Sequence, residues 1–305
     1  MNILITGATG LIGSALVSYL KTDAHRIFRI GRSLQNKRND ICLDLSTEWN
    51  LTLPDVNVII HCAAQTNNYD AFREPLYDLN TNIGGLVKII ENYRKQKLLP
   101  FIIFIGNATQ IGMTTSIGDG EYKKCDNPIT FYDLSKDTAE NYLMMYVYHK
   151  IVSGCSLRLC NVYGAKSEIQ THGRGILDKM MQKALNRESL TVYGDGSYLR
   201  DYVHIEDVVR AIDHAIEYRE QLNGRTFVIG SGIGNSIAEA FNLVAEVAAE
   251  TTGCRVDVNC VPPPNDLSEI EFRSYVADID DFTKLTGWKP KWGLKEGLRY
   301  SYSAV

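Results

Sequence analysis

The sequence feature that most constrains the fold is a glycine-rich segment, Thr6-Gly-Ala-Thr-Gly-Leu-Ile-Gly13, which directly follows the apolar run Ile3-Leu-Ile5. An amphipathic stretch with Leu16 and Leu20 on its apolar side comes next, so the predicted order is strand, turn and helix. Glycines three residues apart allow a tight turn, close approach of the backbone to a pyrophosphate, and close packing of helix on strand. The N–H groups at the helix N-terminus attract phosphate. The segment therefore predicts dinucleotide binding rather than a purely structural turn.

Further apolar runs follow at 26–30, 40–45, 56–60, 101–105 and 155–159. Helical patterns lie between them, from about Asn82 to Tyr93 and from Thr130 to Tyr148. Strands that alternate with helices predict a doubly wound, mostly parallel α/β sheet with ligands at the carboxyl ends of its strands. A length of 305 residues is long for one core, so we expect a second, smaller domain.

The composition is that of an ordinary globular protein. The net charge of -4 provides no basic field for nucleic acid or anionic membranes. The seven cysteines form no C-x-x-C pair and are odd in number, so we expect neither a metal site nor a disulfide framework. No apolar run reaches the roughly 20 residues of a membrane span. These features favour a reduced, cytoplasmic protein with neither a signal peptide nor a membrane segment.

The predicted second strand ends in Gly31-Arg32-Ser33. An acidic residue at this position usually holds the ribose 2′-hydroxyl of NAD. A guanidinium with a neighbouring hydroxyl suits a 2′-phosphate better. We therefore expect NADP(H), with NAD(H) as the alternative and a solvated loop arginine as the simpler reading. Asp44, in the third strand, is expected to meet the adenine.

A tyrosine and a lysine, Tyr132 and Lys136, lie one turn apart near the start of a predicted helix. Thr130 is the expected N-cap, and Asp133 completes an acidic variant of a capping box. A tyrosine pKa of about 10 is too high for acid–base work near neutral pH. We expect Lys136, together with a cationic cofactor ring, to lower it. Taken alone, the spacing is common by chance and also fits a half-buried Tyr beside a surface Lys.

Six motifs in order, T-G-x-x-G-x-x-G, D-L, H-C-A-A, N-I-G-G, Y-x-x-S-K and R-L-C-N-V-Y-G, resemble those of extended short-chain dehydrogenases/reductases. The closest resemblance is to the group of nucleotide-sugar epimerases, dehydratases and 4-ketoreductases. The segments 192–197, 200–208 and 288–297 extend it over the whole chain. The resemblance implies a Rossmann-type sheet, residues 1–164 with return segments near 204–218 and 227–231, and a nucleotide-sugar domain built mainly from 165–305. It also implies a homodimer through helices near 84–97 and 131–149.

The resemblance further implies roles for individual residues. Tyr132 exchanges a proton with the sugar, and Lys136 binds the nicotinamide ribose. The residues expected at the cofactor are Gly7, Thr9, Gly10, Leu11, Ile12, Gly13, Arg32, Ser33, Asp44, Leu45, Cys62, Ala63, Ala64 and Asn82, together with Tyr132 and Lys136. The residues expected at the nucleotide sugar are Asn161, Val192, Tyr193 and Arg200, with Arg273 as a second phosphate ligand. For each, core packing or a solvated charge is the simpler alternative.

Three departures from the family pattern bear on the reaction. Asn107 occupies the place of the usual Ser or Thr, with Thr109 as its possible substitute. Ala108 and Thr109 replace the Asp-Glu pair of dehydratases, so a dehydratase is not expected. The usual R-P-G-D segment reads Pro263-Pro-Asn-Asp266, which leaves Arg273 or Arg174 to supply the second phosphate charge.

These observations predict an enzyme that acts on a nucleotide-diphosphate sugar. The first expectation is NADPH-dependent reduction of a 4-keto deoxysugar nucleotide, with Tyr132 as proton donor. The alternative is a 4-epimerase that holds its cofactor tightly and makes no net redox change. A cofactor-sensing protein without catalysis is the third reading, against which the Tyr132–Lys136 pair argues. The sequence does not distinguish CDP, UDP, dTDP and GDP, or the sugar's stereochemistry.

Overall fold

A parallel seven-stranded sheet forms the centre of the computed structural model, which describes residues 1–305 apart from 22–23, 36, 114–125, 165–174 and 303–305. The strand order is β10-β6-β5-β4-β1-β2-β3, and each neighbouring pair is parallel. The strands are β1 (Asn2–Thr6), β2 (Arg26–Gly31), β3 (Asp40–Cys42), β4 (Val58–His61), β5 (Phe101–Asn107), β6 (Ser153–Leu159) and β10 (Thr226–Ile229). The predicted doubly wound α/β fold is confirmed.

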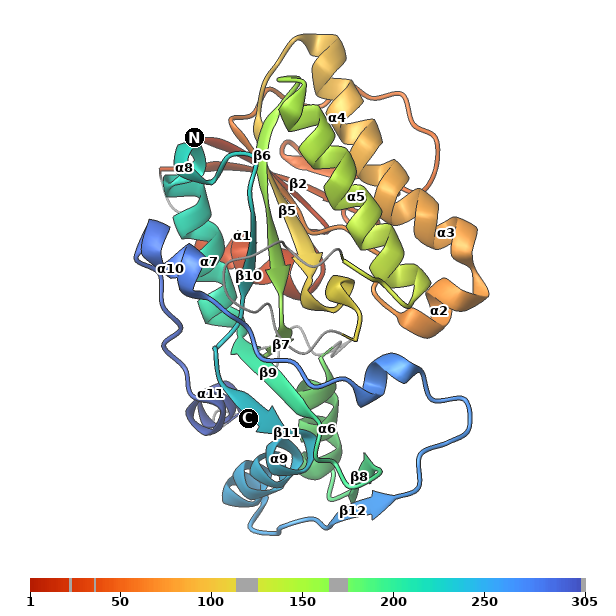
Figure 1. Cartoon of the computed structure of the whole chain (residues 1–305). Coiled ribbons are helices and arrows are strands. Elements are labelled where there is room, and N and C mark those ends of the chain that lie inside the picture. The colour runs from red at the N-terminus through yellow and green to blue at the C-terminus, as the bar shows by residue number, and fades with distance from the viewer. Residues whose placement is uncertain (22–23, 36, 114–125, 165–174, 303–305) are drawn as a thin grey trace.

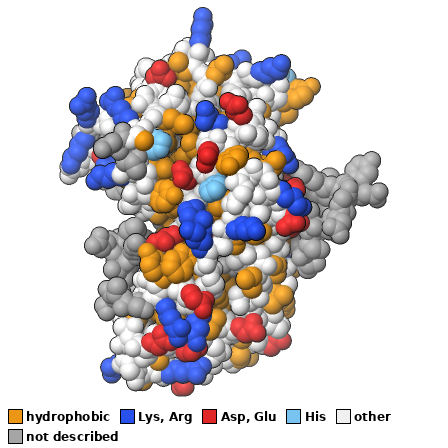
Figure 2. All heavy atoms as spheres, turned by 90° about the vertical axis from the view of Figure 1, so that its left-hand side faces the viewer, with side chains coloured by type: hydrophobic (Ala, Val, Ile, Leu, Met, Phe, Trp, Pro, Cys, Tyr) orange, Lys and Arg blue, Asp and Glu red, His pale blue; other side chains and the backbone are white. Residues whose placement is uncertain are grey.

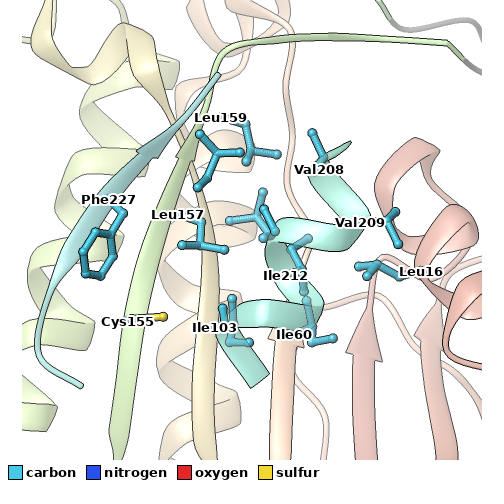
Figure 3. Close-up of a cluster of buried hydrophobic side chains, with 14 of the residues drawn as sticks. Leu16, Ile60, Ile103, Cys155, Leu157, Leu159, Val208, Val209, Ile212 and Phe227 are labelled. Carbon is cyan, nitrogen blue, oxygen red and sulfur yellow. The ribbon is translucent and has the colours of Figure 1, made fainter. Parts of the chain in front are cut away.

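Helices cover both faces of this sheet (Figure 1). α1 (Leu11–Tyr19) and α7 (Ile205–Glu217) pack on one face, and α4 (Gly85–Gln96) and α5 (Phe131–Tyr148) pack on the other. Alternate residues of one strand therefore enter different cores. Ile103 packs with Ile212 of α7, whereas Ile102, also fully buried, belongs to the core under α4 and α5. Figure 3 shows the core between the sheet and α7. Because both faces of the sheet are covered, every residue of a central strand is buried, and the strands appear in the sequence as unbroken apolar runs.

Several predicted element boundaries differ from the structure, and two of them concern predicted cofactor residues. The third strand was expected to reach Leu45 but ends at Cys42. Asp44 instead turns the chain, because its Oδ1 accepts hydrogen bonds from the N–H (2.9 Å) and hydroxyl (2.7 Å) of Ser46. The helix expected from Asn82 begins at Gly85, since Asn82 lies in a π-helical turn, Asn80–Gly84. Such turns are frequent at functional sites.

The remaining strands form two small sheets below the first (Figure 1). One sheet contains β7 (Asn161–Tyr163), β9 (Leu199–His204) and β11 (Gly234–Ser236), and the other contains β8 (Leu190–Tyr193) and β12 (Val258–Val261). They share a core with α6 (Ile176–Leu185), α9 (Ile237–Thr252) and α11 (Leu294–Tyr302). Although α7 and β10 lie between β9 and β11 in sequence, both pack in the layers of the large sheet. The domain boundary at residue 164 stays a prediction.

Short helices complete the described chain. They are α2 (Asn68–Arg73), α3 (Pro75–Leu79), α8 (Arg219–Leu222), α10 (Asp280–Thr286) and two 3-10 helices, Ala108–Ile111 and Glu269–Phe272. No helix in the described ranges is long and apolar enough to cross a membrane. Figure 2 shows charged side chains of both signs interspersed over one face of the molecule.

Candidate active site

The glycine turn between β1 and α1 has no room for side chains. Gly7 adopts φ +63°, and a Cβ there would lie 2.8 Å from the Ala63 backbone nitrogen. A Cβ on Gly13 would lie 2.3 Å from the Gly7 carbonyl oxygen. Gly10 is the N-cap of α1 and offers no side-chain cap, so the first N–H groups of the helix stay available. The turn therefore fits the pyrophosphate of a dinucleotide.

A cavity of about 760 Å³ begins at this turn and reaches the small sheets. Predicted residues that line it are Gly7, Gly10, Leu11, Ile12, Gly13, Cys62, Ala64, Asn107, Tyr132, Lys136, Asn161, Val192, Tyr193 and Arg200. The structure thus brings the glycine turn, the Tyr132–Lys136 pair and the predicted nucleotide-sugar residues to one space. It has the size expected of a ligand pocket.

Other predicted cofactor residues lie outside the lining of this cavity. They are Thr9, Arg32, Ser33, Asp44, Leu45, Ala63 and Asn82. Arg32 is exposed, and its Nη1 donates to the Tyr77 hydroxyl at 2.7 Å. The Leu45 side chain is buried in the core and contacts the backbone of Gly85. Leu45 therefore has a packing role in this structure.

Tyr132 and Lys136 lie on the buried side of α5, with exposed fractions of 8% and 2%. Thr130 is the N-cap, as predicted, and its hydroxyl accepts from the Asp133 N–H at 3.0 Å. The Lys136 ammonium lies 4.0 Å from the centroid of the Phe104 ring. Burial lowers the pKa of Lys136 to about 8, and the charges of Cys62, Glu140 and Asp78 oppose this shift. Lys136 therefore keeps most of its charge at neutral pH.

The pKa of Tyr132 differs from the expectation. Burial of the phenol raises it above its ordinary value, as do the charges of Asp133 and Asp78. A hydrogen bond with the Asn107 side chain acts in the opposite direction but is a smaller effect. The lowering expected from Lys136 does not prevail, because burial of the phenol is the largest effect and the charges of Asp133 and Asp78 act in the same direction. Tyr132 is therefore protonated at neutral pH and suited to donate a proton.

Asn107, the last residue of β5, occupies the place opposite Tyr132. It caps the 3-10 helix Ala108–Ile111, where its Oδ1 accepts from the Thr109 N–H at 3.2 Å. The Thr109 hydroxyl points elsewhere and donates to Asp133 Oδ1. Thr109 is also absent from the cavity lining. Of the two candidates for the Ser/Thr position, the structure therefore places Asn107 at the cavity.

The carboxamide of Asn82 connects three segments at this end of the sheet through hydrogen bonds. Its nitrogen donates to Asp78 Oδ1 (3.0 Å), the Ser135 hydroxyl (2.9 Å) and the Gln65 carbonyl (3.1 Å), and its oxygen accepts from the Gln65 N–H (2.8 Å). Asn82 is 1% exposed. It joins the π-helical turn, the segment after β4 and α5, which explains the interrupted helix.

The two predicted phosphate arginines differ in position. Arg200 lines the cavity, but its guanidinium also donates to the backbone carbonyls of Leu199, Glu271 and Arg273. Arg273 is 3% exposed and lies outside the lining, where its Nη1 faces the carbonyls of Ala108 (3.4 Å) and Gly112 (3.5 Å). The predicted phosphate role of Arg273 is therefore not supported, because its side chain is turned into the protein. Arg174 lies outside the described residues.

Sequence reasoning missed several residues that line the cavity. Tyr198 and Phe272 form an aromatic pair with ring centroids 5.6 Å apart, and Lys183 and Glu271 add charges of opposite sign. Glu271 and Phe272 come from a 3-10 helix far along the chain, which no motif marked. For Lys183 the sequence had one signal, the amphipathic pattern of its helix, in which Lys183 lies next to buried Ala184 near the end of the helix.

Comparison with known proteins identifies this architecture. Residues 3–230 match the NAD dependent epimerase/dehydratase family. A UDP-glucose 4-epimerase of Mycolicibacterium smegmatis is 26% identical over 98% of this chain and 96% of its own. A CDP-paratose 2-epimerase of Salmonella typhi is 25% identical over 99% and 98%.

A solved structure is similarly close over its whole length. The UDP-glucose 4-epimerase of Thermotoga maritima with UDP-glucose superposes with a TM-score of 0.81 at 26% identity, covering 99% of this chain and 97% of that one. The family match spans well over half of the sequence and includes the glycine turn and the Tyr132–Lys136 pair. The chain belongs to the NAD dependent epimerase/dehydratase family, and it is an NAD(P)-dependent enzyme of the extended short-chain dehydrogenase/reductase type.

Proposed function

We propose that the protein epimerises a nucleotide-diphosphate sugar at C4, holding its dinucleotide through the whole cycle with no net redox change. The observation that carries this proposal is a continuous cavity that joins the glycine turn, Tyr132 and the predicted nucleotide-sugar residues. The relatives named above, which match over nearly their whole length, are epimerases by name. This reading replaces reduction of a 4-keto sugar, the first expectation, as the better supported one.

In this cycle the chain's own groups move one proton and hold one oxygen. Tyr132 would take the proton of the C4 hydroxyl as C4 gives up its hydride, and it would return that proton to the same oxygen. The configuration is inverted because the keto sugar turns before hydride returns to the opposite face of C4. Asn107 supplies an amide for a hydrogen bond to the reacting oxygen without itself moving a proton. Lys136 would bind the ribose beside Tyr132, and the first N–H groups of α1 would hold the pyrophosphate. An oxidised dinucleotide would supply a hydride acceptor when bound, and its positive charge would favour the phenolate of Tyr132, which is protonated in the free protein.

The test is turnover without added reductant. We expect the purified protein to convert UDP-glucose, or a CDP-, dTDP- or GDP-sugar from a panel, into its C4 epimer, detected by chromatography of the released sugar. The near-ultraviolet absorbance of reduced nicotinamide should not change in proportion to product. Stoichiometric loss of that absorbance with a 4-keto sugar, and no epimer, would instead establish the reductase.

The reductase is kept as a second candidate because of one observation. Arg32 follows β2 where an acidic residue usually binds the ribose of NAD, and its guanidinium lies near Asp44, whose pKa it helps to lower. A cation at this place suits a 2′-phosphate, and NADPH suits net reduction. The preference for NADP(H) over NAD(H) is thus a proposal that substitution of Arg32 can test.

We also propose a homodimer, with a contact surface that differs from the one expected. The exposed residues at the end of α4 are charged (Arg94 and Lys95). Apolar side chains are instead exposed on α2, α3 and α5: Phe72, Leu76, Leu79, Phe131, Leu134, Tyr142 and Met145. Phe72 and Phe131 lie side by side with ring centroids 6.1 Å apart, which joins the exposed residues of α2 to the start of α5.

A face of this kind suits a two-fold contact with a second copy of the chain. We expect Leu76→Glu combined with Leu134→Glu to halve the molecular mass measured by light scattering. Ile233→Glu, a matched change at an exposed apolar residue next to β11, should leave the mass unchanged. A wild-type protein that is already monomeric at micromolar concentration would refute the dimer.

A further inference from the structure

Asp133, the residue after Tyr132, is fully buried in the first turn of α5. Its Oδ2 accepts from the Thr130 hydroxyl at 2.7 Å, and its Oδ1 accepts from the Thr109 hydroxyl. A capping box would require the carboxylate to accept from the Thr130 N–H, so the box predicted from the sequence forms only in part. The carboxylate instead joins the helix that carries Tyr132 to the turn that carries Asn107.

The orientation of the Asn107 amide depends on that turn. Its oxygen accepts from the Thr109 N–H, and its backbone N–H donates to Gln110 Oε1 at 2.7 Å. The Asn107 side-chain hydrogen bond lowers the pKa of Tyr132, which is the effect of an amide N–H that donates to the phenol oxygen. The Thr109 hydroxyl links this turn to Asp133 in the first turn of α5, and Gln110 Nε2 makes a longer contact of 3.5 Å with Glu140 farther along the same helix.

Arg273 contributes a favourable charge to the buried carboxylate of Asp133. Its guanidinium lies against the carbonyls of Ala108 and Gly112, on either side of Thr109, and its charge lowers the pKa of Asp133. Burial acts in the opposite direction and is the larger effect, while Thr109 and Thr130 also favour the ionised form. Arg273, which was expected to bind a phosphate, thus acts on the carboxylate of Asp133.

We infer that Asp133 is a positioning residue, which holds the Asn107 amide against the Tyr132 phenol through Thr109, with Arg273 as its counter-ion. The inference rests on the proposed acid–base role of Tyr132. The other charged or titratable groups near the pair are Asp78 of α3, Lys136 one turn along α5, and Cys62 after β4, which faces Lys136.

The first test breaks the link but keeps the charge. Thr109→Val has the same shape without the hydroxyl, so Asn107 should lose its fixed place. We expect kcat to fall by about tenfold or more, because small misplacements of reacting groups are costly. KM and dinucleotide affinity should hold, since Thr109 lies outside the cavity lining. Thr109→Ser restores the hydroxyl and should recover most of the lost kcat; equal kcat for Thr109→Val and wild type would overturn the inference.

The second test reads Tyr132 directly and needs no turnover. The ionisation of Tyr132 is followed by ultraviolet absorbance in the protein saturated with oxidised dinucleotide, with the matching Tyr132→Phe variant subtracted. Asp133→Asn removes a charge that raises the pKa of Tyr132 but keeps an amide oxygen that can accept from the Thr109 hydroxyl, so ionisation should move to lower pH. Thr109→Val loosens the Asn107 bond that lowers this pKa, so ionisation should move to higher pH.

Opposite shifts are the result that a merely structural role would not produce. Unchanged ionisation in both variants would sink the inference even if the enzyme proves to be an epimerase. Opposite shifts in a protein that epimerises no nucleotide sugar would sustain the positioning role while the proposed function fails. If Asp133→Asn does not fold, the Thr109 variants alone test the inference, because the Thr109 hydroxyl is the donor of the hydrogen bond that Asp133 accepts.

Discussion

Replacing Gly13 with alanine should uncouple α1 from the turn that binds the dinucleotide. An added Cβ would lie 2.3 Å from the Gly7 carbonyl oxygen and 2.8 Å from the Ala8 Cα, both backbone atoms. Ordinary contact begins at 3.4 Å, so the turn and the helix would have to separate by about 1.1 Å. No flexible side chain is available to move instead, because the nearest atoms belong to the backbone.

Two measurable losses follow from this displacement. Overpacking of this kind costs ~1–3 kcal/mol of stability. In a chain of this length that corresponds to a fall in Tm of about 2–6 °C. Displaced N–H groups would also lose hydrogen bonds to the charged pyrophosphate, each worth ~1.5–3 kcal/mol, or about 10- to 150-fold in Kd.

Gly10→Ala is the matched control. Its Cβ would meet only the Gly7 carbonyl oxygen, at 3.2 Å, so the fold should tolerate it. Gly10 lines the cavity, however, and a methyl group there should weaken dinucleotide binding while changing Tm by only about 1 °C. Calorimetric titration with NAD and NADP, together with thermal unfolding, separates the two variants. A Gly13→Ala protein with wild-type Tm and wild-type Kd would refute the reasoning.

Three further predictions address single residues. Tyr132→Phe should reduce kcat by about 100-fold or more, since general acid–base catalysis contributes that much, with dinucleotide affinity retained; turnover near wild type would contradict its role. Arg32→Ala should weaken binding of NADP far more than of NAD, because only NADP has the 2′-phosphate, and equal weakening in calorimetry would disprove the NADP preference. Burial, and next the charge of Lys136, lower the pKa of His61 from 6.5 to about 3. Between the two pKa values the unfolded chain therefore binds a proton on His61 that the folded chain does not. The free energy of unfolding falls as the pH is lowered through this range, by ~2 kcal/mol at about pH 5. Denaturant unfolding of His61→Gln at several pH values should lack this part of the pH dependence, and an unchanged slope would argue against a buried neutral histidine.

The layers of the fold were predictable from the sequence because apolar periodicity reflects burial. Runs such as Phe101–Ile105 are apolar at every position, and the structure buries both faces of that strand. The boundaries were less predictable, because single side chains decide them. Asp44 ends β3 by bonding Ser46, and Asn82 interrupts a helix by bonding Gln65 and Ser135. Neither bond has a periodic signal.

The site was predictable as a set of positions but not as a set of bonds. An arginine near an expected site indicates where charge is available, while its partners depend on residues that no motif includes. Arg273 illustrates this, because it was expected at a phosphate and its charge instead lowers the pKa of Asp133 against the larger effect of burial. The departures from the family pattern are consistent with one another: an amide at Asn107 needs a fixed turn, the turn is anchored on a buried acid, and the acid needs a cation.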